Sequence, residues 1–243
     1  MIYLSVIIPA YNEEKRLPGT LDSIAEYIKS MKKEVEVIVV VDGSRDNTKQ
    51  VAESYKDKIA GLRVLDYGDN RGKGFAVKTG MLEAKGEYVL FMDADNATPL
   101  SEVEKLWPFV SGYEIVIGSR HLKDSNVVIK QPWYRILISR LGNFVIQALI
   151  IKDIKDTQCG FKLFTCKAAQ EIFSRQQIDR WGFDMEILSI AQKVLGYKIK
   201  EVPVSWYNSA ESRLRPVRDA LRTLRELLKI KSNLITGKYK KTA

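Results

Sequence analysis

The sequence predicts an α/β fold built on a mostly parallel β-sheet with flanking helices. Three observations predict it: short runs rich in Val and Ile, polar segments of helix length between them, and Gly, Asp or Pro at the boundaries. Uninterrupted Val and Ile runs are typical of strands that are buried on both faces of a parallel sheet. With 243 residues, of which 45% are hydrophobic and 28% charged, the chain is long enough to bury a sizeable core.

The elements of the first half follow in a regular order. We expect strands at residues 3–9, 34–43, 62–68 and 88–95, with helices at 13–31, 46–56 and 72–86 between them. In open parallel sheets, ligands bind beyond the carboxyl ends of the strands. The loops that follow these strands therefore build one site at one edge of the sheet.

The composition sets broad limits on the class of protein. The first residues lack a basic start and no apolar run approaches the ~18–20 residues of a membrane span, so we expect neither a secretory signal nor a transmembrane helix. Cys159 and Cys166 are expected to be core thiols. The net charge of +9 suits an anionic partner. Composition shifts near residue 120, which divides one continuous domain into residues 1–125 and 126–243.

Two carboxylates end the apolar run of residues 88–95. Asp93 and Asp95 are one residue apart, and like charges so close repel each other unless a cation lies between them. Mg²⁺ and Mn²⁺ prefer oxygen ligands and keep positions open for substrate phosphates. The sequence therefore predicts that Asp93 and Asp95 bind a divalent cation that also holds a pyrophosphate.

Two further motifs lie at strand ends of the same half. Asp42, in the segment VDGSRDNT, either accepts a hydrogen bond from a base N–H or belongs to a simple turn that caps a helix. The segment GDNRGKGFAVKTG places glycines and cations, Lys73 among them, before a helix. Such an arrangement holds phosphate at a helix N-terminus in many proteins.

Four segments resemble, in their order along the chain, the nucleotide-binding half of the inverting glycosyltransferases of family 2, which have the GT-A fold. These segments are SVIIPAYNEE, VIVVVDGSRDNT, NRGKGFAVKTGMLEAKGEYVLFMDADNAT and IVIGSR. The later segments DTQCGFKLF, WGFDMEIL and VPVSWYNSAESRLRPVRDALRTLRELLKI are similar to the dolichyl-phosphate β-glucosyltransferase branch, which is related to dolichyl-phosphate mannose synthase. The resemblance covers nearly the whole chain, and residues 70–98 are its most specific part.

The resemblance implies roles for individual residues. It makes residues 1–125 the nucleotide-sugar half and residues 126–243 the acceptor and membrane half. Asp93 and Asp95 become the metal-binding and catalytic carboxylates. The implied nucleotide contacts are Pro9, Tyr11, Glu13, Asp42, Lys73, Asp93, Ala94 and Asp95. Val41 departs from the family, which usually has Asp there, so donor specificity is expected to be looser or shifted if relatives use that Asp.

Two segments of the second half have amphipathic patterns. In residues 133–151 the polar residues Arg135, Ser139, Asn143 and Gln147 recur every four, which predicts an interfacial helix or an ordinary core helix. Near the C-terminus, Val217, Leu221, Leu224 and Leu228 share one helical face beside Arg218, Arg222, Arg225 and Lys229. Basic amphipathic helices bind anionic membranes, although a solvated helix is the alternative. With the resemblance, the expected location is peripheral, on the cytoplasmic face of a membrane.

Arginines are the expected ligands of an acceptor phosphate, because their planar fork matches phosphate oxygens. Arg120 follows a strand and should lie at the same edge as Asp93, which also makes it a candidate catalytic residue. The others are Arg135, Arg140 and Arg213, and a surface ion pair is the alternative for each.

A further group, Gln158, Asp184 and Glu186, is expected in a sugar or acceptor loop. Asp184 and Glu186 are candidates for the general base of a transfer to a hydroxyl, Asp184 first, or they bind sugar hydroxyls or shape that loop. A helix cap is the alternative for both residues.

The resemblance implies Mg²⁺- or Mn²⁺-dependent transfer of glucose from UDP-glucose to dolichyl or polyprenyl phosphate, with inversion. A lipid monophosphate is largely dianionic at neutral pH, because its second pKa is about 6, so no general base is required. Alternatives are GDP-mannose as donor, transfer to a hydroxyl with Asp184 as base, and a binding protein without enzymatic activity. Nucleic acid is not an expected partner, since no motif of interleaved aromatic and basic residues is present. The sequence predicts no oligomeric state.

Overall fold

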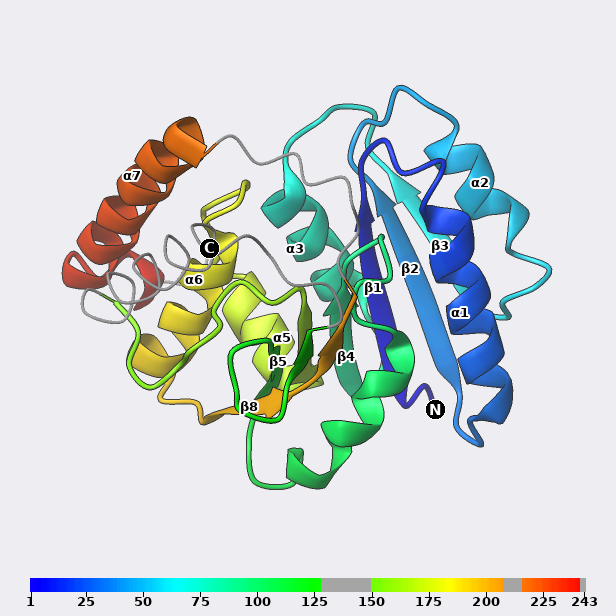
Figure 1. Cartoon of the computed structure of the whole chain (residues 1–243). Coiled ribbons are helices and arrows are strands. Elements are labelled where there is room, and N and C mark those ends of the chain that lie inside the picture. Colours follow the sequence, from blue (N-terminus) through cyan, green and yellow to red (C-terminus); the bar gives the residue numbers. More distant parts are fainter. Residues whose placement is uncertain (128–149, 208–215, 241–243) are drawn as a thin grey trace.

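The computed structural model describes residues 1–127, 150–207 and 216–240, and its centre is a seven-stranded sheet in the order β3-β2-β1-β4-β7-β5-β8 (Figure 1). The strands are β1 (Leu4–Ala10), β2 (Val35–Val41), β3 (Leu62–Asp66), β4 (Tyr88–Met92), β5 (Ile115–Ser119), β7 (Phe161–Thr165) and β8 (Ile199–Pro203). A second, two-stranded sheet pairs β6 (Asn126–Val127) with β9 (Ser205–Trp206).

One strand of the main sheet runs against the others. β7 pairs antiparallel with both β4 and β5, whereas all other neighbours are parallel. The register places Phe161, the first residue of β7, opposite Met92, the last residue of β4. The segment that leads into β7 therefore meets the carboxyl ends of the parallel strands.

Helices cover both faces of the sheet and form two apolar layers with it. One layer contains α1 (Leu17–Ser30), α2 (Thr48–Ser54), η1 (Leu100–Lys105) and η2 (Trp107–Phe109). The other contains α3 (Lys73–Glu83), α5 (Cys166–Phe173), α6 (Phe183–Ser189), η3 (Ile190–Val194), α7 (Pro216–Ile235) and η4 (Lys238–Lys240). Figure 1 shows α1 and α2 on one side of the strands and α5, α6 and α7 toward the other.

The strand residues explain why both faces need cover. In β4, Val89 and Phe91 pack in the layer of α3, while Leu90 and Met92 pack in the layer of α1. Successive strand side chains point to opposite faces, so an unbroken apolar run is buried only between two layers of helices.

The structure confirms the expected elements of the first half, with shorter ends. The helix expected from residue 13 begins at Leu17, because the backbone N–H groups of Arg16 and Leu17 both donate to the carbonyl of Glu13 in a preceding turn. The strand expected at 88–95 ends at Met92, which leaves Asp93 and Asp95 in the following loop.

The second half shares the same sheet, since β7 and β8 extend the order set by the first strands. The boundary at residue 125 therefore divides the sequence without dividing the sheet, and it stays a prediction. The basic C-terminal helix is present as α7. Apart from its last two residues, the helix expected at 133–151 lies outside the described residues. Within the described part of the chain, no helix is both long enough and apolar enough to cross a bilayer.

Candidate active site

The candidate site lies at the edge of the sheet where β1, β2, β4 and β5 have their carboxyl ends. These strands are parallel to one another, because β4 and β5 are both antiparallel to β7. The loops that follow them, together with the loop before β7, bring side chains far apart in the sequence to one place. The strand-end loops thus gather at one sheet edge, as expected, and their use as a single ligand site stays a prediction.

Asp93 and Asp95 lie in the loop after β4, and each has a cation of the protein nearby. Lys73, the first residue of α3, places its Nζ 2.6 Å from Oδ1 of Asp93. Arg16 lies with a guanidinium nitrogen 3.7 Å from Oδ2 of Asp95, whose Oδ1 accepts a hydrogen bond from the Ala97 N–H at 3.1 Å. The mutual repulsion of the two carboxylates is thus offset by cations from two separate elements.

The same two carboxylates suit a hard divalent cation. Their side chains keep 37% (Asp93) and 21% (Asp95) exposure, so both remain accessible from solvent. Among the described residues, no cluster of three or more His, Cys, Asp or Glu side chains is placed to hold a metal. A donor set of two carboxylates leaves coordination positions for phosphate oxygens and water, which is how Mg²⁺ and related ions are usually held.

Gly160 packs directly against Asp93 from the loop before β7. The Asp93 N–H donates to the Gly160 carbonyl at 3.2 Å. A Cβ on Gly160 would lie 2.1 Å from Oδ2 of Asp93, so any side chain there displaces the carboxylate. Sequence reasoning did not select Gly160. The sequence signal that points to it is a glycine directly before a strand, which is often a place of close backbone approach. The structure adds that this strand, β7, runs antiparallel to β4.

Lys162 and Asp184 form a buried ion pair next to Lys73. The Lys162 side chain has no exposed surface, and its Nζ lies 2.5 Å from Oδ1 of Asp184 and 2.5 Å from the Cys159 carbonyl oxygen. Because a buried charge is costly without a partner, this pair is held by mutual neutralisation and by the carbonyl. Lys162 thereby ties α6 to the loop that carries Gly160.

The charges of this cluster influence one another. Burial lowers the pKa of Lys73, but the carboxylates of Asp93 and Asp184 together raise it above its ordinary value. Burial raises the pKa of Asp184, and the neighbouring Lys162 and Lys73 only partly oppose this. Lys73 therefore stays charged and links the exposed Asp93 with the buried Asp184. Sequence reasoning missed Lys162, because the strand FKLFT gives no sign of a buried partner for its lysine.

Arg120 lies at the site edge, directly after β5, and its fork is engaged by Asp156. Its Nε and one terminal nitrogen each lie 2.8 Å from a carboxylate oxygen of Asp156, and its backbone N–H donates to the same carboxylate at 2.9 Å. Burial would raise the pKa of Asp156, but Arg120 lowers it to about 2, and Asp156 in turn raises the pKa of Arg120 against burial. Contact of Arg120 with an acceptor phosphate stays a prediction.

Asp42 is buried after β2, and its carboxylate organises the loop of residues 67–72. Its oxygens accept hydrogen bonds from the Tyr67 hydroxyl at 2.6 Å, the Asn70 amide at 3.0 Å, and the backbone N–H groups of Arg71 at 2.8 Å and Gly72 at 2.9 Å. The structure therefore shows a loop-fixing role that the sequence did not indicate. Base recognition by Asp42 stays a prediction.

The glycines before α3 allow close approach of another loop. A Cβ at Gly72 would lie 2.5 Å from the Asp179 carbonyl oxygen, and one at Gly74 would lie 2.7 Å from that of Ile178. The Phe75 N–H, in the first turn of α3, donates to the Asp179 carbonyl at 3.0 Å. Part of the helix N-terminus that we expected to face phosphate is thus covered by protein.

The first loop of the expected nucleotide site is pinned to the loop after β2. The N–H of Asn12 donates to the Ser44 hydroxyl at 3.0 Å, and the N–H of Glu13 donates to the Thr48 hydroxyl at 2.7 Å. This loop contains Tyr11, and the Glu13 carboxylate is paired with Arg16.

Other residues of the expected nucleotide site are mostly buried. Pro9 is buried within β1, and Ala94 is buried with its carbonyl accepting from the Thr20 hydroxyl at 2.7 Å. Val41 is buried in the apolar layer of α1. Nucleotide contacts of Pro9, Tyr11, Glu13 and Ala94 stay predictions.

Residues of the expected acceptor loop differ in where they point. Gln158 is exposed, two residues before Gly160. Glu186 has no exposed surface, and its carboxylate accepts from the backbone N–H groups of Gln177 and Ile178 and from the Tyr239 hydroxyl. Glu186 therefore fixes the backbone of residues 177–178, and sugar binding by Glu186 stays a prediction. Arg135, Arg140 and Arg213 lie outside the described residues.

Trp181 is an exposed aromatic residue beside the carboxylates. Its side chain lies on the loop before α6 with 57% exposure, and the Lys73 Nζ lies 5.6 Å from its ring centroid. Sequence reasoning did not select it. An exposed ring next to a cation at the site offers a flat surface for a ligand.

The mostly parallel sheet, its covering helices and the strand-end carboxylate pair define a GT-A type α/β fold. Solved structures share it: glucosyl-3-phosphoglycerate synthase from Mycobacterium tuberculosis, in complex with Mn²⁺, uridine diphosphate and glucosyl-3-phosphoglycerate, matches with a TM-score of 0.70 and 21% identity over 95% of this chain and 80% of that one. Mannosyl-3-phosphoglycerate synthase from Rubrobacter xylanophilus matches with a TM-score of 0.71 and 18% identity over 100% of this chain and 76% of that one.

The chain belongs to the glycosyl transferase family 2, whose family model matches residues 5–173, and it is a glycosyltransferase. Curated relatives named dolichyl-phosphate beta-glucosyltransferase are similar over 98% of the chain and 77% of their own length. The identity is 40% for the protein of Dictyostelium discoideum, 39% for that of Homo sapiens and 35% for that of Saccharomyces cerevisiae. The resemblance read from the sequence motifs is confirmed.

Proposed function

We propose that this glycosyltransferase transfers glucose from UDP-glucose to dolichyl or polyprenyl phosphate, with inversion at the anomeric carbon and with Mg²⁺ or Mn²⁺. The observation that carries the proposal is the accessible pair Asp93 and Asp95, flanked by Lys73 and Arg16 at the sheet edge. The names of the curated relatives and the Mn²⁺ and uridine diphosphate in the structural neighbour support the choice of reactants.

Asp93 and Asp95 would hold the divalent cation, which when bound would supply Lewis-acid stabilisation of the nucleoside diphosphate leaving group. Gly160 leaves the space in which the Asp93 carboxylate takes its orientation. Lys73 adds a fixed positive charge 2.6 Å from Asp93, so the diphosphate meets a site with cations on more than one side.

The acceptor needs no general base, because a lipid monophosphate is already largely dianionic. The protein then has to bring the anionic acceptor phosphate close to a sugar that is linked to an anionic nucleoside diphosphate. Arg120 is one of the described arginines at this edge. Because its guanidinium group is paired with Asp156, it contacts the acceptor phosphate only by sharing or exchanging that carboxylate. Arg135, Arg140 and Arg213 are further proposed ligands of this phosphate.

Transfer to a hydroxyl with Asp184 as general base is the rival reaction. A general base has to accept a proton from the substrate within hydrogen-bond reach. Asp184 is buried and already paired with Lys162 at 2.5 Å, which supports the role of a charge partner for the site lysines. The lipid-phosphate reaction is therefore favoured.

A lipid acceptor brings the enzyme to a membrane, and α7 supplies a suitable surface. Leu224 and Leu228 are exposed, while the helix docks on the core through the buried Leu227 and Ile230. The described part of the expected apolar face, Leu224 and Leu228, is thus available to a bilayer interface. We propose peripheral attachment on the cytoplasmic face.

The test is a donor panel. Purified protein is incubated with dolichyl phosphate, Mn²⁺, and either UDP-glucose or GDP-mannose, and lipid extracts are analysed for sugar-phosphate lipid. We expect product from UDP-glucose alone, and loss of that product with EDTA. Product from GDP-mannose alone would overturn the donor.

Absence of lipid product with either donor would overturn the acceptor. In that case Asp184→Asn, assayed with sugar acceptors across a range of pH, tests the hydroxyl reaction. Asp57→Asn, which changes an exposed carboxylate far from the site edge, is the matched control.

A further inference from the structure

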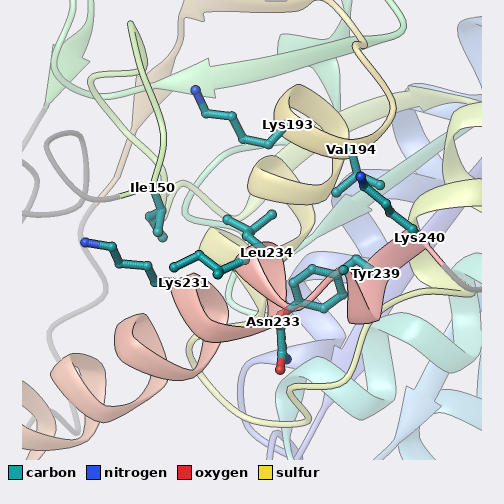
Figure 2. A pocket seen from close by; sticks show the side chains of 10 residues that line it. Ile150, Lys193, Val194, Lys231, Asn233, Leu234, Tyr239 and Lys240 are labelled. Carbon is teal, nitrogen blue, oxygen red and sulfur yellow. Dashed lines mark hydrogen bonds between the residues drawn. The ribbon is translucent and has the colours of Figure 1, made fainter.

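A pocket lies away from the sheet edge, between η3, α7 and η4. It has a volume of about 290 Å³ and is drawn in Figure 2. The side chains of Ile150, Val194 and Leu234 and the ring of Tyr239 form its apolar interior. None of these residues belongs to the candidate active site.

The polar groups of the pocket floor are engaged within the protein. The Tyr239 hydroxyl donates to the Glu186 carboxylate at 2.7 Å and accepts from the Asn233 amide at 3.1 Å. That amide also lies 3.3 Å from the Gln177 side-chain oxygen. The floor therefore presents mainly hydrocarbon to a ligand, which favours an aliphatic chain over a sugar or a base.

The rim of the pocket is cationic. Lys193, Lys231 and Lys240 line it, no Asp or Glu does, and none of the three lysines forms an ion pair with another described residue. In Figure 2 the stems of Lys193 and Lys231 run along the wall and their amines point outward, away from the apolar side chains. An apolar interior with lysines at separate points of its rim matches an amphiphile with an anionic head.

The pocket continues an exposed apolar face of α7. Leu224, Leu228 and Ile235 are 45%, 56% and 77% exposed, and their spacings of four and seven residues place them on one side of the helix. Lys231 and Ile235 belong to this side and also line the pocket. A membrane surface in contact with the apolar side of α7 would therefore also contact the opening of the pocket.

We propose that this pocket binds an anionic glycerophospholipid of the membrane, with the phosphate head at the three lysines and the first part of an acyl chain on the apolar floor. The inference extends the membrane contact of the proposed function to a lipid-specific site. It does not depend on the donor sugar or on the acceptor. A free phosphate compound would use the lysines but leave the apolar floor without a partner.

The test measures binding to vesicles of phosphatidylcholine alone and to vesicles that also contain phosphatidylglycerol. The triple variant Lys193→Gln, Lys231→Gln, Lys240→Gln should weaken binding to the anionic vesicles roughly 100-fold. The matched control removes three charges from the first half, at the exposed residues Lys32, Lys56 and Lys85. It should weaken binding about twofold or less. Equal losses in the two triple variants would mean a general charge effect and would overturn the pocket.

A second variant tests the apolar floor at constant charge. Val194→Phe fills the pocket and should weaken binding to anionic vesicles about threefold, because the acyl chain loses its place. Unchanged binding by this variant would overturn the acyl-chain part of the proposal. Calorimetric titration with glycerol 3-phosphate is the remaining arm: saturable binding that the lysine triple variant loses would assign the pocket to a free phosphate compound instead.

Glucosyl transfer to a short-chain polyprenyl phosphate in detergent separates this proposal from the proposed function. The lysine triple variant should transfer glucose at the wild-type rate there, while its vesicle binding is weak. Failure of wild-type protein to transfer glucose, together with lysine-dependent vesicle binding, would overturn the reaction and leave the lipid site standing.

Discussion

Two pairs of a cation and a carboxylate lie at the same sheet edge and differ in their access to solvent. Arg120 holds Asp156, whose side chain is 1% exposed, by two hydrogen bonds of 2.8 Å. Lys73 contacts Asp93, whose side chain is 37% exposed, through one short contact. In the closed pair, Asp156 has lost its contact with water and depends on Arg120 for neutralisation of its charge. In the open pair, Asp93 is partly solvated and can exchange Lys73 for a ligand. From this difference in burial we expect the Arg120–Asp156 pair to stabilise the fold and Asp93 to be available to a ligand.

The largest expected effect comes from breaking the closed pair. In Arg120→Met, Asp156 stays buried without its partner, and the free energy of unfolding should fall by about 3–5 kcal/mol. Urea unfolding followed by circular dichroism measures it. The double variant Arg120→Met, Asp156→Leu should recover most of the loss, and a single variant as stable as the wild type would remove the distinction between the pairs.

Breaking the open pair should affect the rate and spare the fold. Asp93→Asn should lower the transfer rate at least ~100-fold, about 3 kcal/mol of activation free energy, because a ligand of the cation is lost. The free energy of unfolding should change by less than about 1 kcal/mol, since the contact is partly solvated. Rates with Mn²⁺ and UDP-glucose are compared with those of the control Asp57→Asn. A large loss of stability would show that Asp93 is structural.

Acid should act on the closed pair. The pKa of Asp156 is about 2 in the folded protein against an ordinary value of 3.8, so its ionised form stabilises the fold above about pH 4. This contribution, about 2 kcal/mol, is lost as the pH falls from 4 toward 2, when the carboxyl is protonated. Unfolding at several pH values should therefore show a shallower acid dependence in Asp156→Asn than in the wild type. Identical slopes would contradict the assigned pairing.

The smallest effect sharpens the geometry of the open pair. Gly160→Ala places a methyl group where the Asp93 carboxylate lies, and kcat/KM should fall about tenfold, or ~1.4 kcal/mol. Stability should change little, because the neighbour is the end of a side chain. Gly112→Ala, with open space at its Cβ, is the control and should behave as the wild type. A Gly160 variant with normal kinetics would mean that the carboxylate has room to move.

How far the sequence predicts this site depends on where each contact comes from. Asp93 and Asp95 were predictable, because their place after a buried strand is local information. The partners of Lys162 and Arg120 were not, since these pairs span 22 and 36 residues and depend on the antiparallel insertion of β7. A local sequence pattern does not predict which distant carboxylate forms an ion pair with a given lysine or arginine.

In the fold, too, the features set by local sequence patterns were predictable and those set by distant contacts were not. The strands and helices of residues 3–95 followed from Val and Ile runs and turn residues. For α7, the pattern indicated an apolar face with Leu224 and Leu228, but the helix packs on the core through Leu227 and Ile230. Both sides of this helix carry leucine or isoleucine, so tertiary contacts decided between them.

The insertion of β7 has a consequence for how this enzyme can change. β5 leaves the sheet at Ser119 and β7 enters it at Phe161, and both points lie at the same edge. The chain between them begins and ends at the edge that carries Asp93 and Asp95, so its length is not fixed by the sheet. Close to its second end, Ile151 and Ile154 are buried in the apolar layer of α3. A change in this connection that keeps these two anchoring side chains can therefore alter the surface beside the carboxylates while the strand order stays the same.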